Sequence, residues 1–366
     1  MNRTKAIKEF RESYVKNICN ETLTNLDCYY LNNKEQFKND FELSFKNACQ
    51  NICAAQNDGC LGEINYLVLC MLRTKIAKND FSFIYKACNY AWLLDIGQFN
   101  AGIYYADFPF SYYLEMQNKL LKEYRRYIGK IVPQDISVIM QEHSSKFMQY
   151  VSNIAKYNIL ELVSWDEFQK IKRAPKFEIH VGEYLDYFEP IYFEDNNKNY
   201  EEITKKFSEK TKIDFSFKDL KGIDFRNRNF IQSNLRFCDL RNSNFSGCNY
   251  SYSVLIGSTM ENSNLSGVNF SYCLLNEVNF KNCNLENSLF TKSIAYCGLE
   301  YPNFWDTVGY LPINFEGSNL RNTDFVGADL KGAVFDNANL EGSVFSKDQI
   351  EYLSLNKKQL NNIKVV

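Results

Sequence analysis

A large apolar residue stands at every fifth position through much of the C-terminal half of this chain. The run begins at Phe215 and ends at Phe290, sixteen positions in succession, and it resumes in the same register from Phe315 to Phe345. Because 45% of the residues are hydrophobic, chance would produce such a run roughly three times in a million. A period of five fits neither a helix, with about 3.6 residues per turn, nor a strand, with about two. The repeat itself therefore defines the fold.

Small and turn-forming residues surround each apolar site. The residue two before it is usually Ser, Cys or Ala, the residue just before it is usually Asp or Asn, and Gly often stands two after it. Ala-Asp-Leu-Lys-Gly at 328–332 and Ala-Asn-Leu-Glu-Gly at 338–342 show the pattern clearly. Here the sequence resembles the pentapeptide-repeat family over residues 213–346. The resemblance implies a right-handed quadrilateral β-helix, with one pentapeptide on each side and 20 residues in each coil.

Stacked coils are needed because one coil cannot bury its own interior. Side chains 20 residues apart should then form columns along the axis. One predicted column is aromatic and contains Phe230, Tyr250, Phe270 and Phe290. The small inward position is often a cysteine, which acts there as a small hydrophobic residue. We therefore expect reduced core thiols at Cys238, Cys248, Cys273 and Cys283.

The whole chain is predicted to be an α+β protein of two domains. Residues 1–205 should form a mainly α-helical domain with a short β element near 176–194, and residues 206–346 the β-helix, with an interrupting loop near 291–314. Residues 347–366 should form a C-terminal capping helix and tail, beginning with a capping box at Ser346 and Gln349.

Within the first domain, the patterning predicts a long amphipathic helix over 34–58, a buried helix over 61–78 and another helix over 134–162. A short helix over 164–172 should begin with a capping box formed by Ser164 and Glu167. The polar segment from Asn196 to Lys206 is the expected linker.

Neither a catalytic nor a metal-binding constellation is evident. The two histidines, His143 and His180, fall in different predicted elements. Cys49, Cys53 and Cys60 share a helical face, but zinc needs four ligands and no adjacent group completes the set. A thiol-lined core face is the competing interpretation. We predict a non-enzymatic protein with no cofactor and no metal.

Charge and hydropathy restrict the partners. Net charge is -2, and residues 213–346 carry 10 basic and 14 acidic groups, so no strong field favours direct binding of nucleic acid or of an anionic membrane. The N-terminus lacks the apolar core of a signal peptide. We expect a cytoplasmic protein that binds another protein.

The repeat geometry also assigns the outward residues, and two adjoining sides of the first coils carry an apolar stripe. Soluble proteins rarely leave such a stripe bare, so either the N-terminal helices or a partner should cover it. The interrupting loop is rich in aromatic residues, and it either binds a partner or packs on its own protein. The partner-binding candidates are Phe217, Phe237, Val254, Ile256, Leu274, Tyr252, Tyr272, Tyr296, Tyr301, Phe304, Trp305 and Tyr310.

These observations favour a protein-binding adaptor or scaffold. The family resemblance adds two expectations by analogy. One is a cargo adaptor of a bacterial secretion or contractile-injection system. The alternative is a DNA-mimicking protein that binds and protects a topoisomerase, gyrase, as in quinolone resistance. The C-terminal helix is expected either to close the end of the β-helix or to mediate a homodimer.

Overall fold

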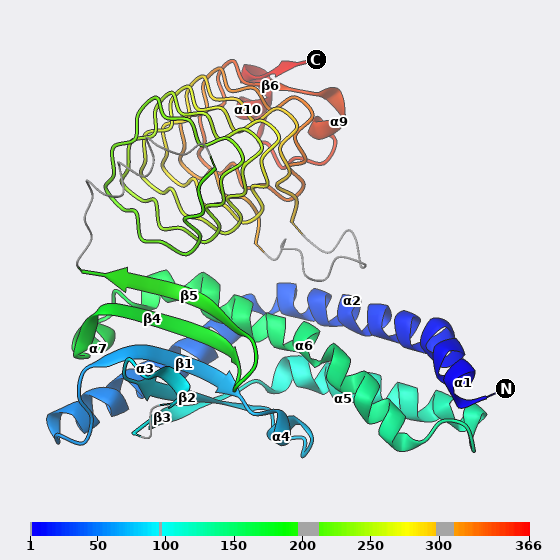
Figure 1. Cartoon of the computed structure of the whole chain (residues 1–366). Coiled ribbons are helices and arrows are strands. Elements are labelled where there is room, and N and C mark those ends of the chain that lie inside the picture. The colour runs from blue at the N-terminus through cyan, green and yellow to red at the C-terminus, as the bar shows by residue number, and fades with distance from the viewer. Residues whose placement is uncertain (1, 95–96, 197–211, 298–310) are drawn as a thin grey trace. The chain divides into compact units, whose positions relative to one another are not determined.

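The computed structural model describes residues 2–94, 97–196, 212–297 and 311–366 (Figure 1). The chain divides into two compact units, one ending at Tyr192 and the other beginning at Phe193. Each unit is described by itself below. The predicted linker lies almost entirely outside the described residues.

Long helices supply much of the first unit. Phe37, Phe41 and Phe45 recur every four residues along α3 and are buried, which gives this helix its core-facing stripe. The prediction of a helix over 134–162 is confirmed by α6, where Pro133 occupies the first turn and the Asp135 carboxylate accepts a 2.9 Å hydrogen bond from the Val132 amide. The helical segments are α1 (Arg3–Phe10), η1 (Arg11–Val15), α2 (Lys16–Asn32), α3 (Lys34–Asn57), α4 (Arg73–Ile76), η2 (Trp92–Leu94), α5 (Asp107–Glu123), η3 (Tyr124–Tyr127), α6 (Pro133–Leu162) and α7 (Asp166–Gln169).

A five-stranded sheet with the order β3-β2-β1-β4-β5 packs with these helices. Its central strand β1 runs antiparallel to β2 and parallel to β4, and β2 runs antiparallel to β3. The strands are β1 (Ile64–Met71), β2 (Ser82–Cys88), β3 (Phe99–Tyr105), β4 (Arg173–Glu183) and β5 (Phe188–Asp195).

The sheet corrects two expectations. The buried helix predicted over 61–78 is wrong, because this segment forms strand β1 followed by the short helix α4. A strand that is buried on both faces is apolar throughout, so its sequence lacks the alternation that distinguishes a strand from a buried helix. The β element expected near 176–194 corresponds only to β4 and β5, and three further strands complete the sheet.

The capping box predicted at Ser164 and Glu167 is also wrong. Helix α7 begins one residue later than expected, with Trp165 at its N-cap and no side-chain cap. The Ser164 hydroxyl instead donates a 2.6 Å hydrogen bond to the Glu161 carbonyl oxygen. The Ser164 hydroxyl therefore binds a carbonyl oxygen near the end of helix α6 instead of capping the start of helix α7.

The second unit contains the predicted β-helix. Successive coils are joined by parallel bridges between residues 20 apart, as in Asp214 with Asn234 and Asn249 with Asn269. The large apolar residue of each pentapeptide points inward and is buried. The predicted aromatic column is confirmed, since the ring centroids of Phe230 and Tyr250 lie 4.6 Å apart and those of Tyr250 and Phe270 5.4 Å apart. Bridges and ring stacking between residues 20 apart therefore hold successive coils together.

The interruption of the repeat is narrower than the predicted range 291–314. Ala295 is fully buried at the next inward position after Phe290, and Ile294 bridges both Leu274 and Asp329. The coil thus continues at least to residue 297, and a small inward alanine hid this from the search for large residues. Asn314 then pairs with Asn279, 35 residues earlier, so an insertion of 15 residues separates two otherwise adjacent pentapeptides.

A compact cap follows the last coil. It consists of β6 (Val344–Phe345), α9 (Lys347–Ile350), α10 (Lys357–Asn362) and β7 (Lys364–Val365), and β7 pairs parallel with β6. The predicted capping box is confirmed at Ser346 and Gln349. The Gln349 amide also donates to the carbonyl oxygens of Phe325 and Ala328, at 2.8 and 2.7 Å. These bonds supplement the Ala328 amide, which also donates to the Phe325 carbonyl oxygen, and the Tyr352 hydroxyl, which lies 3.4 Å from the Ala328 carbonyl oxygen.

Candidate functional site

The backbone of the coil selects the residue type at one outward position. The residue two after each inward side chain commonly has a left-handed backbone, with φ between 54° and 81°. Glycine and asparagine predominate there, as steric clash with Cβ requires. Four aromatic residues nevertheless occupy it, namely Phe217 (φ 63°), Phe237 (φ 54°), Tyr252 (φ 62°) and Tyr272 (φ 60°).

The two phenylalanines pack within the protein. Their ring centroids lie 5.3 Å apart at an interplanar angle of 18°, and both side chains are half-buried. The ring of Phe237 in turn covers Gly257 in the next coil, where a Cβ atom would collide with it. Packing within the repeat domain therefore explains why these two positions are phenylalanine.

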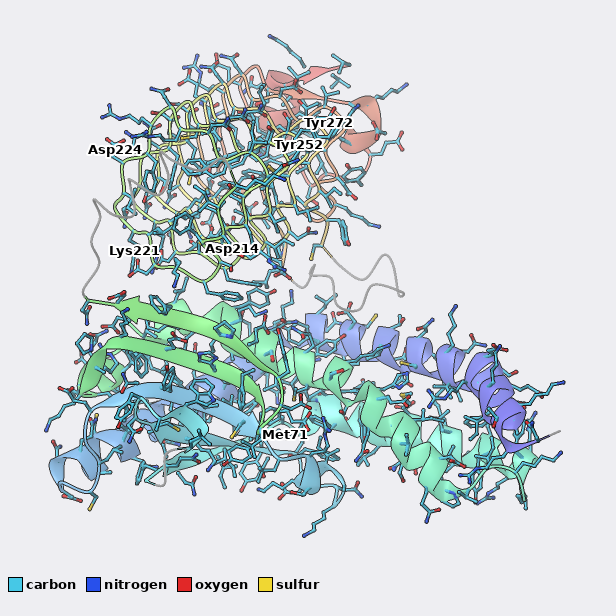
Figure 2. The ribbon with its side chains drawn as sticks, viewed as in Figure 1. Met71, Asp214, Lys221, Asp224, Tyr252 and Tyr272 are labelled. Carbon is cyan, nitrogen blue, oxygen red and sulfur yellow. The ribbon has the colours of Figure 1, made fainter. Side chains whose placement is uncertain are left out.

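The two tyrosines form a second stack that is open to solvent. Their ring centroids lie 4.8 Å apart at 6°, while Tyr252 is 56% and Tyr272 is 44% exposed. Figure 2 shows the two labelled side chains beside each other on the repeat domain. The Lys292 ammonium lies 5.7 Å from the centroid of the Tyr272 ring and ends the stack on that side. We call Tyr252 and Tyr272 the tyrosine ladder.

An aliphatic column lies next to this ladder. Val254, Leu274 and Ile294 are bridged to one another in successive coils, and they occupy the position that is usually Asp or Asn. Leu289 replaces the same residue type just before Phe290, and its side chain is 41% exposed, against 40% for Ile294. The tyrosine ladder together with Val254, Leu274, Leu289 and Ile294 is called the apolar corner.

The apolar corner is almost free of charge. The polar residues beside the ladder are Asn249, Ser251, Asn269 and Ser271, none of them ionisable. Elsewhere the outer columns carry paired charges. The Arg241 guanidinium lies 2.6 Å from the Asp239 carboxylate, and the Lys281 ammonium lies 2.9 Å from Glu316. The neutral, half-exposed corner therefore differs chemically from these charged columns.

The predicted partner-binding residues have different surroundings in the structure. Tyr252, Val254, Leu274 and Tyr272 meet at the apolar corner, whereas Ile256 is only 7% exposed. Tyr296 is half-buried, and its carbonyl oxygen accepts a hydrogen bond from the Asn276 amide. Leu289 and Ile294 were not among the predicted residues, although an aliphatic residue in place of Asp or Asn was a usable signal. The remaining candidates lie outside the described residues: Tyr301, Phe304, Trp305 and Tyr310.

The ionisable groups considered from the sequence do not assemble. His143 lies on α6, its Nδ1 is 2.8 Å from the Ile139 carbonyl oxygen, and burial lowers its pKa. His180 lies on β4, 2.7 Å from the Glu178 carboxylate. Cys49 is buried in α3, and desolvation raises the pKa of its thiol, whereas Cys60 is exposed beyond the end of that helix. Within the described ranges, no three His, Cys, Asp or Glu side chains are grouped as metal ligands.

Comparison with known proteins supports the assignment of the second unit. A family model described as pentapeptide repeats matches in eight copies, over residues 219–249, 253–291 and 313–346. Residues 219–346 form a pentapeptide-repeat domain. No family match falls in the N-terminal unit, and a search of curated proteins found no match to the chain. Proteins with such repeats are typically of the interaction or scaffold type.

Several solved pentapeptide-repeat proteins are similar to this domain. Rfr23 from the cyanobacterium Cyanothece 51142 is 17% identical over 41% of this chain and 97% of its own, with a TM-score of 0.25. QnrB1, a plasmid-mediated fluoroquinolone resistance protein, is 14% identical over 42% and 88%, with a TM-score of 0.22. HetL from Nostoc sp. strain PCC 7120, involved in regulation of heterocyst differentiation, is 15% identical over 41% and 98%, with a TM-score of 0.14.

No helix among the described residues has both the length and the apolar character needed to cross a membrane.

Proposed function

We propose that this chain is a non-catalytic adaptor or scaffold, whose pentapeptide-repeat domain docks a protein at the apolar corner. The observation that carries the proposal is the tyrosine ladder, held on left-handed backbone and half-exposed. A non-glycine residue in this conformation costs about 1–2 kcal/mol, whereas an aromatic stack contributes about 0.5–1.5 kcal/mol. Folding alone therefore gives little reason to place tyrosines there. Tyrosine is, however, enriched among the residues that dominate binding energy at protein interfaces.

The proposal extends to the shape of the docking surface and to the role of the N-terminal unit. The coil would present four sides, with the apolar corner where two of them meet, so that a partner docks along an edge of a rigid rod. The N-terminal unit would hold a second protein, as a cargo adaptor of a bacterial secretion or contractile-injection system does. Twelve free cysteines fit the reducing cytoplasm that this role implies.

Site-specific photo-crosslinking tests the docking surface. A benzophenone amino acid is placed at Tyr252 in the full chain and, as a matched control, at Asn262, which is exposed and has the same left-handed backbone (φ 60°). We expect a discrete adduct from position 252 in the native cell, identified by mass spectrometry, and none from position 262. Equal adducts at both positions, or none at 252, would refute the proposal.

The topoisomerase alternative is tested separately. A gyrase supercoiling assay with a quinolone, run with and without the purified protein, should show no rescue if the adaptor proposal holds. Protection of gyrase at micromolar protein would favour the alternative.

A further inference from the structure

The first unit concentrates positive charge at one end of its long helices. Helix α1 together with residues 122–135 carries seven basic and three acidic residues, a net charge of +4, whereas the net charge of the whole chain is -2. Residues 1–212 contain equal numbers of basic and acidic residues, which conceals this imbalance. Figure 1 shows α1 at the end of the helices that points away from the sheet of the same unit. We call α1 and residues 122–135 the basic tip.

Direct contacts join the two segments of the basic tip. The ring centroids of Phe10 and Tyr127 lie 5.6 Å apart, and the Tyr127 hydroxyl donates a 3.1 Å hydrogen bond to the Glu9 carboxylate. The Arg3 guanidinium lies 2.8 Å from the Asp135 carboxylate. The two segments therefore present their side chains as a single surface.

The acidic groups of the tip have partners, whereas several of its cations do not. The Glu123 carboxylate lies 3.0 Å from the Arg126 guanidinium, and Glu9 and Asp135 are bound as described above. A cation without an ion pair at an exposed position remains available to an anion outside the protein. Within the described part of the chain, the exposed cations of the tip that form no ion pair are Lys5, Lys122, Arg125 and Lys130.

An exposed isoleucine lies among these cations. Ile128 precedes a tight turn in which the amides of Lys130 and Ile131 both donate to the Tyr127 carbonyl oxygen, at 2.9 and 3.0 Å. Gly129, with φ of 82°, permits the reversal of the chain. The turn buries Ile131, which is 2% exposed, and leaves Ile128 74% exposed. Because its side chain stays in water, Ile128 contributes little to the hydrophobic stabilisation of the fold.

This combination of charge and apolar surface fits an anionic membrane better than a nucleic acid. Nucleic acid would bind the cations through its phosphates, but it would engage a protruding aliphatic side chain only by wedging it between base pairs. A membrane engages both, because acidic headgroups attract Lys and Arg while apolar side chains enter the acyl boundary. Tyrosines are enriched at the headgroup level, and the half-buried Tyr124 and Tyr127 lie beside Ile128 in the sequence.

We propose that the basic tip binds the surface of an anionic membrane, with Ile128 at the acyl boundary and the unpaired cations on the acidic headgroups. Each Lys or Arg near such a surface raises the partition coefficient about fivefold. Burial of the exposed part of Ile128 raises it roughly tenfold. The binding is therefore peripheral, reversible and weakened by salt. This inference goes beyond the proposed function and is independent of the apolar corner.

Co-sedimentation of the full chain with lipid vesicles tests the proposal. Phosphatidylcholine vesicles that contain about 30% phosphatidylserine are compared with pure phosphatidylcholine vesicles, at about 0.1–3 mM lipid. We expect binding to the anionic vesicles, much weaker binding to the neutral ones, and loss of binding when NaCl is raised from about 0.1 to 0.5 M. Equal binding to both kinds of vesicle, or binding to neither, would overturn the proposal.

Two double variants with the same change in charge locate the contact. Arg125→Gln with Lys130→Gln should weaken partitioning into anionic vesicles about 25-fold. Lys78→Gln with Lys176→Gln is the control, because both lysines are exposed in the sheet region and neither forms an ion pair with a described residue. The control should partition almost as the parent protein does. An equal loss in the two double variants would show that net charge, rather than the tip, governs binding.

A substitution at constant charge tests the role of the isoleucine. Ile128→Ser should weaken partitioning roughly tenfold, whereas the control Leu185→Ser, at a side chain that is 70% exposed on the β4–β5 turn, should not weaken it. Unchanged partitioning of Ile128→Ser would remove insertion from the proposal and overturn it. Equal midpoints of urea unfolding show that the variants fold like the parent protein.

A DNA duplex of about 20 base pairs, in a mobility-shift assay at about 0.1 M NaCl, represents the other class of polyanion. We expect it to bind less tightly than the anionic vesicles do. Duplex binding that is lost in Arg125→Gln with Lys130→Gln, in a protein that does not bind the vesicles, would assign the tip to nucleic acid and refute a membrane contact.

Discussion

Two glycines that lie two pentapeptides apart offer a controlled test of how the repeat domain accommodates its aromatic outward residues. Gly257 and Gly267 both have φ of 67°. A methyl group added at Gly267 meets no atom within 4 Å, whereas one added at Gly257 collides with the ring of Phe237. Alanine therefore costs both sites the same backbone strain, and only Gly257→Ala must also displace an aromatic ring.

The magnitudes follow from these contacts. The left-handed backbone penalises alanine relative to glycine by about 1–2 kcal/mol, which is all that we expect at Gly267. At Gly257 the displaced Phe237 ring also loses its 5.3 Å stack on Phe217, worth about 0.5–1.5 kcal/mol, and overpacking adds about 1–3 kcal/mol. We expect Gly257→Ala to destabilise the coil by about 3–5 kcal/mol in total.

Hydrogen exchange of the full chain, followed by mass spectrometry, measures this difference in the coil itself. The reporter is the Phe237 amide, which donates a 2.9 Å hydrogen bond to the Ile256 carbonyl oxygen, and its opening free energy should fall much further in Gly257→Ala than in Gly267→Ala. Replacing Phe237 by Asn in the Gly257→Ala background should recover most of the excess. Equal costs at the two glycines, or no coupling between positions 237 and 257, would refute the steric argument.

Three further predictions address other parts of the molecule. Desolvation raises the pKa of Asp27 from 3.8 to about 6, so the contribution of this carboxyl group to stability is full below pH 3.8 and is lost as the pH rises through 6. In urea unfolding, Asp27→Asn should therefore become more stable than the parent protein by about 1–3 kcal/mol between pH 5 and 7. A difference between the two proteins that does not change with pH would contradict this. Gln349→Met removes one of the two donors from each of the Phe325 and Ala328 carbonyl oxygens and should lower the opening free energy of the last coil by about 1–3 kcal/mol, measured by hydrogen exchange. The exposed Lys347→Ala should not lower it, and equal exchange in both variants would refute the role of the Gln349 amide. In the native protein, alkylation should label the exposed Cys28 and Cys60 before the buried cysteines of the repeat domain, which are Cys238, Cys248, Cys273 and Cys283. Burial raises the pKa of these four thiols to between about 11 and 12. Peptide mapping that finds exposed and buried cysteines labelled at the same rate would overturn the prediction.

The repeat domain was predictable because one constraint dominates its sequence. Each pentapeptide buries one large residue, so the large inward positions from Phe215 to Phe290 can be read directly, and they are buried in the structure. Ala295 follows the same rule with a smaller side chain, and it escaped a search for large residues. The extent of the interruption was misjudged for this reason.

The sheet of the N-terminal unit could not be read in this way. Strand β1 is apolar along almost its whole length because it is paired on both edges and buried on both faces. Its helical or extended conformation is decided by pairing with β2 and β4, which are distant segments of the chain. Single-sequence patterning contains no record of those pairings.

The candidate site could be predicted only in part from the sequence. Repeat arithmetic identifies which residues point outward, but exposure also depends on the neighbouring coils. Ile256 is outward by position and only 7% exposed, whereas Tyr252 is 56% exposed. Ile294 was missed because it falls inside the range first assigned to the interrupting loop.

The left-handed position separates residues required by the fold from those that the fold does not explain. Asparagine and glycine at this position satisfy the backbone, and Phe217 and Phe237 are explained by packing on each other and on Gly257. Tyr252 and Tyr272 have the same strained backbone but remain about half-exposed. This difference is why we propose a binding role for the two tyrosines. Sequence and repeat register identify aromatic residues at left-handed positions, and it is their exposure in the structure that separates Tyr252 and Tyr272 from Phe217 and Phe237.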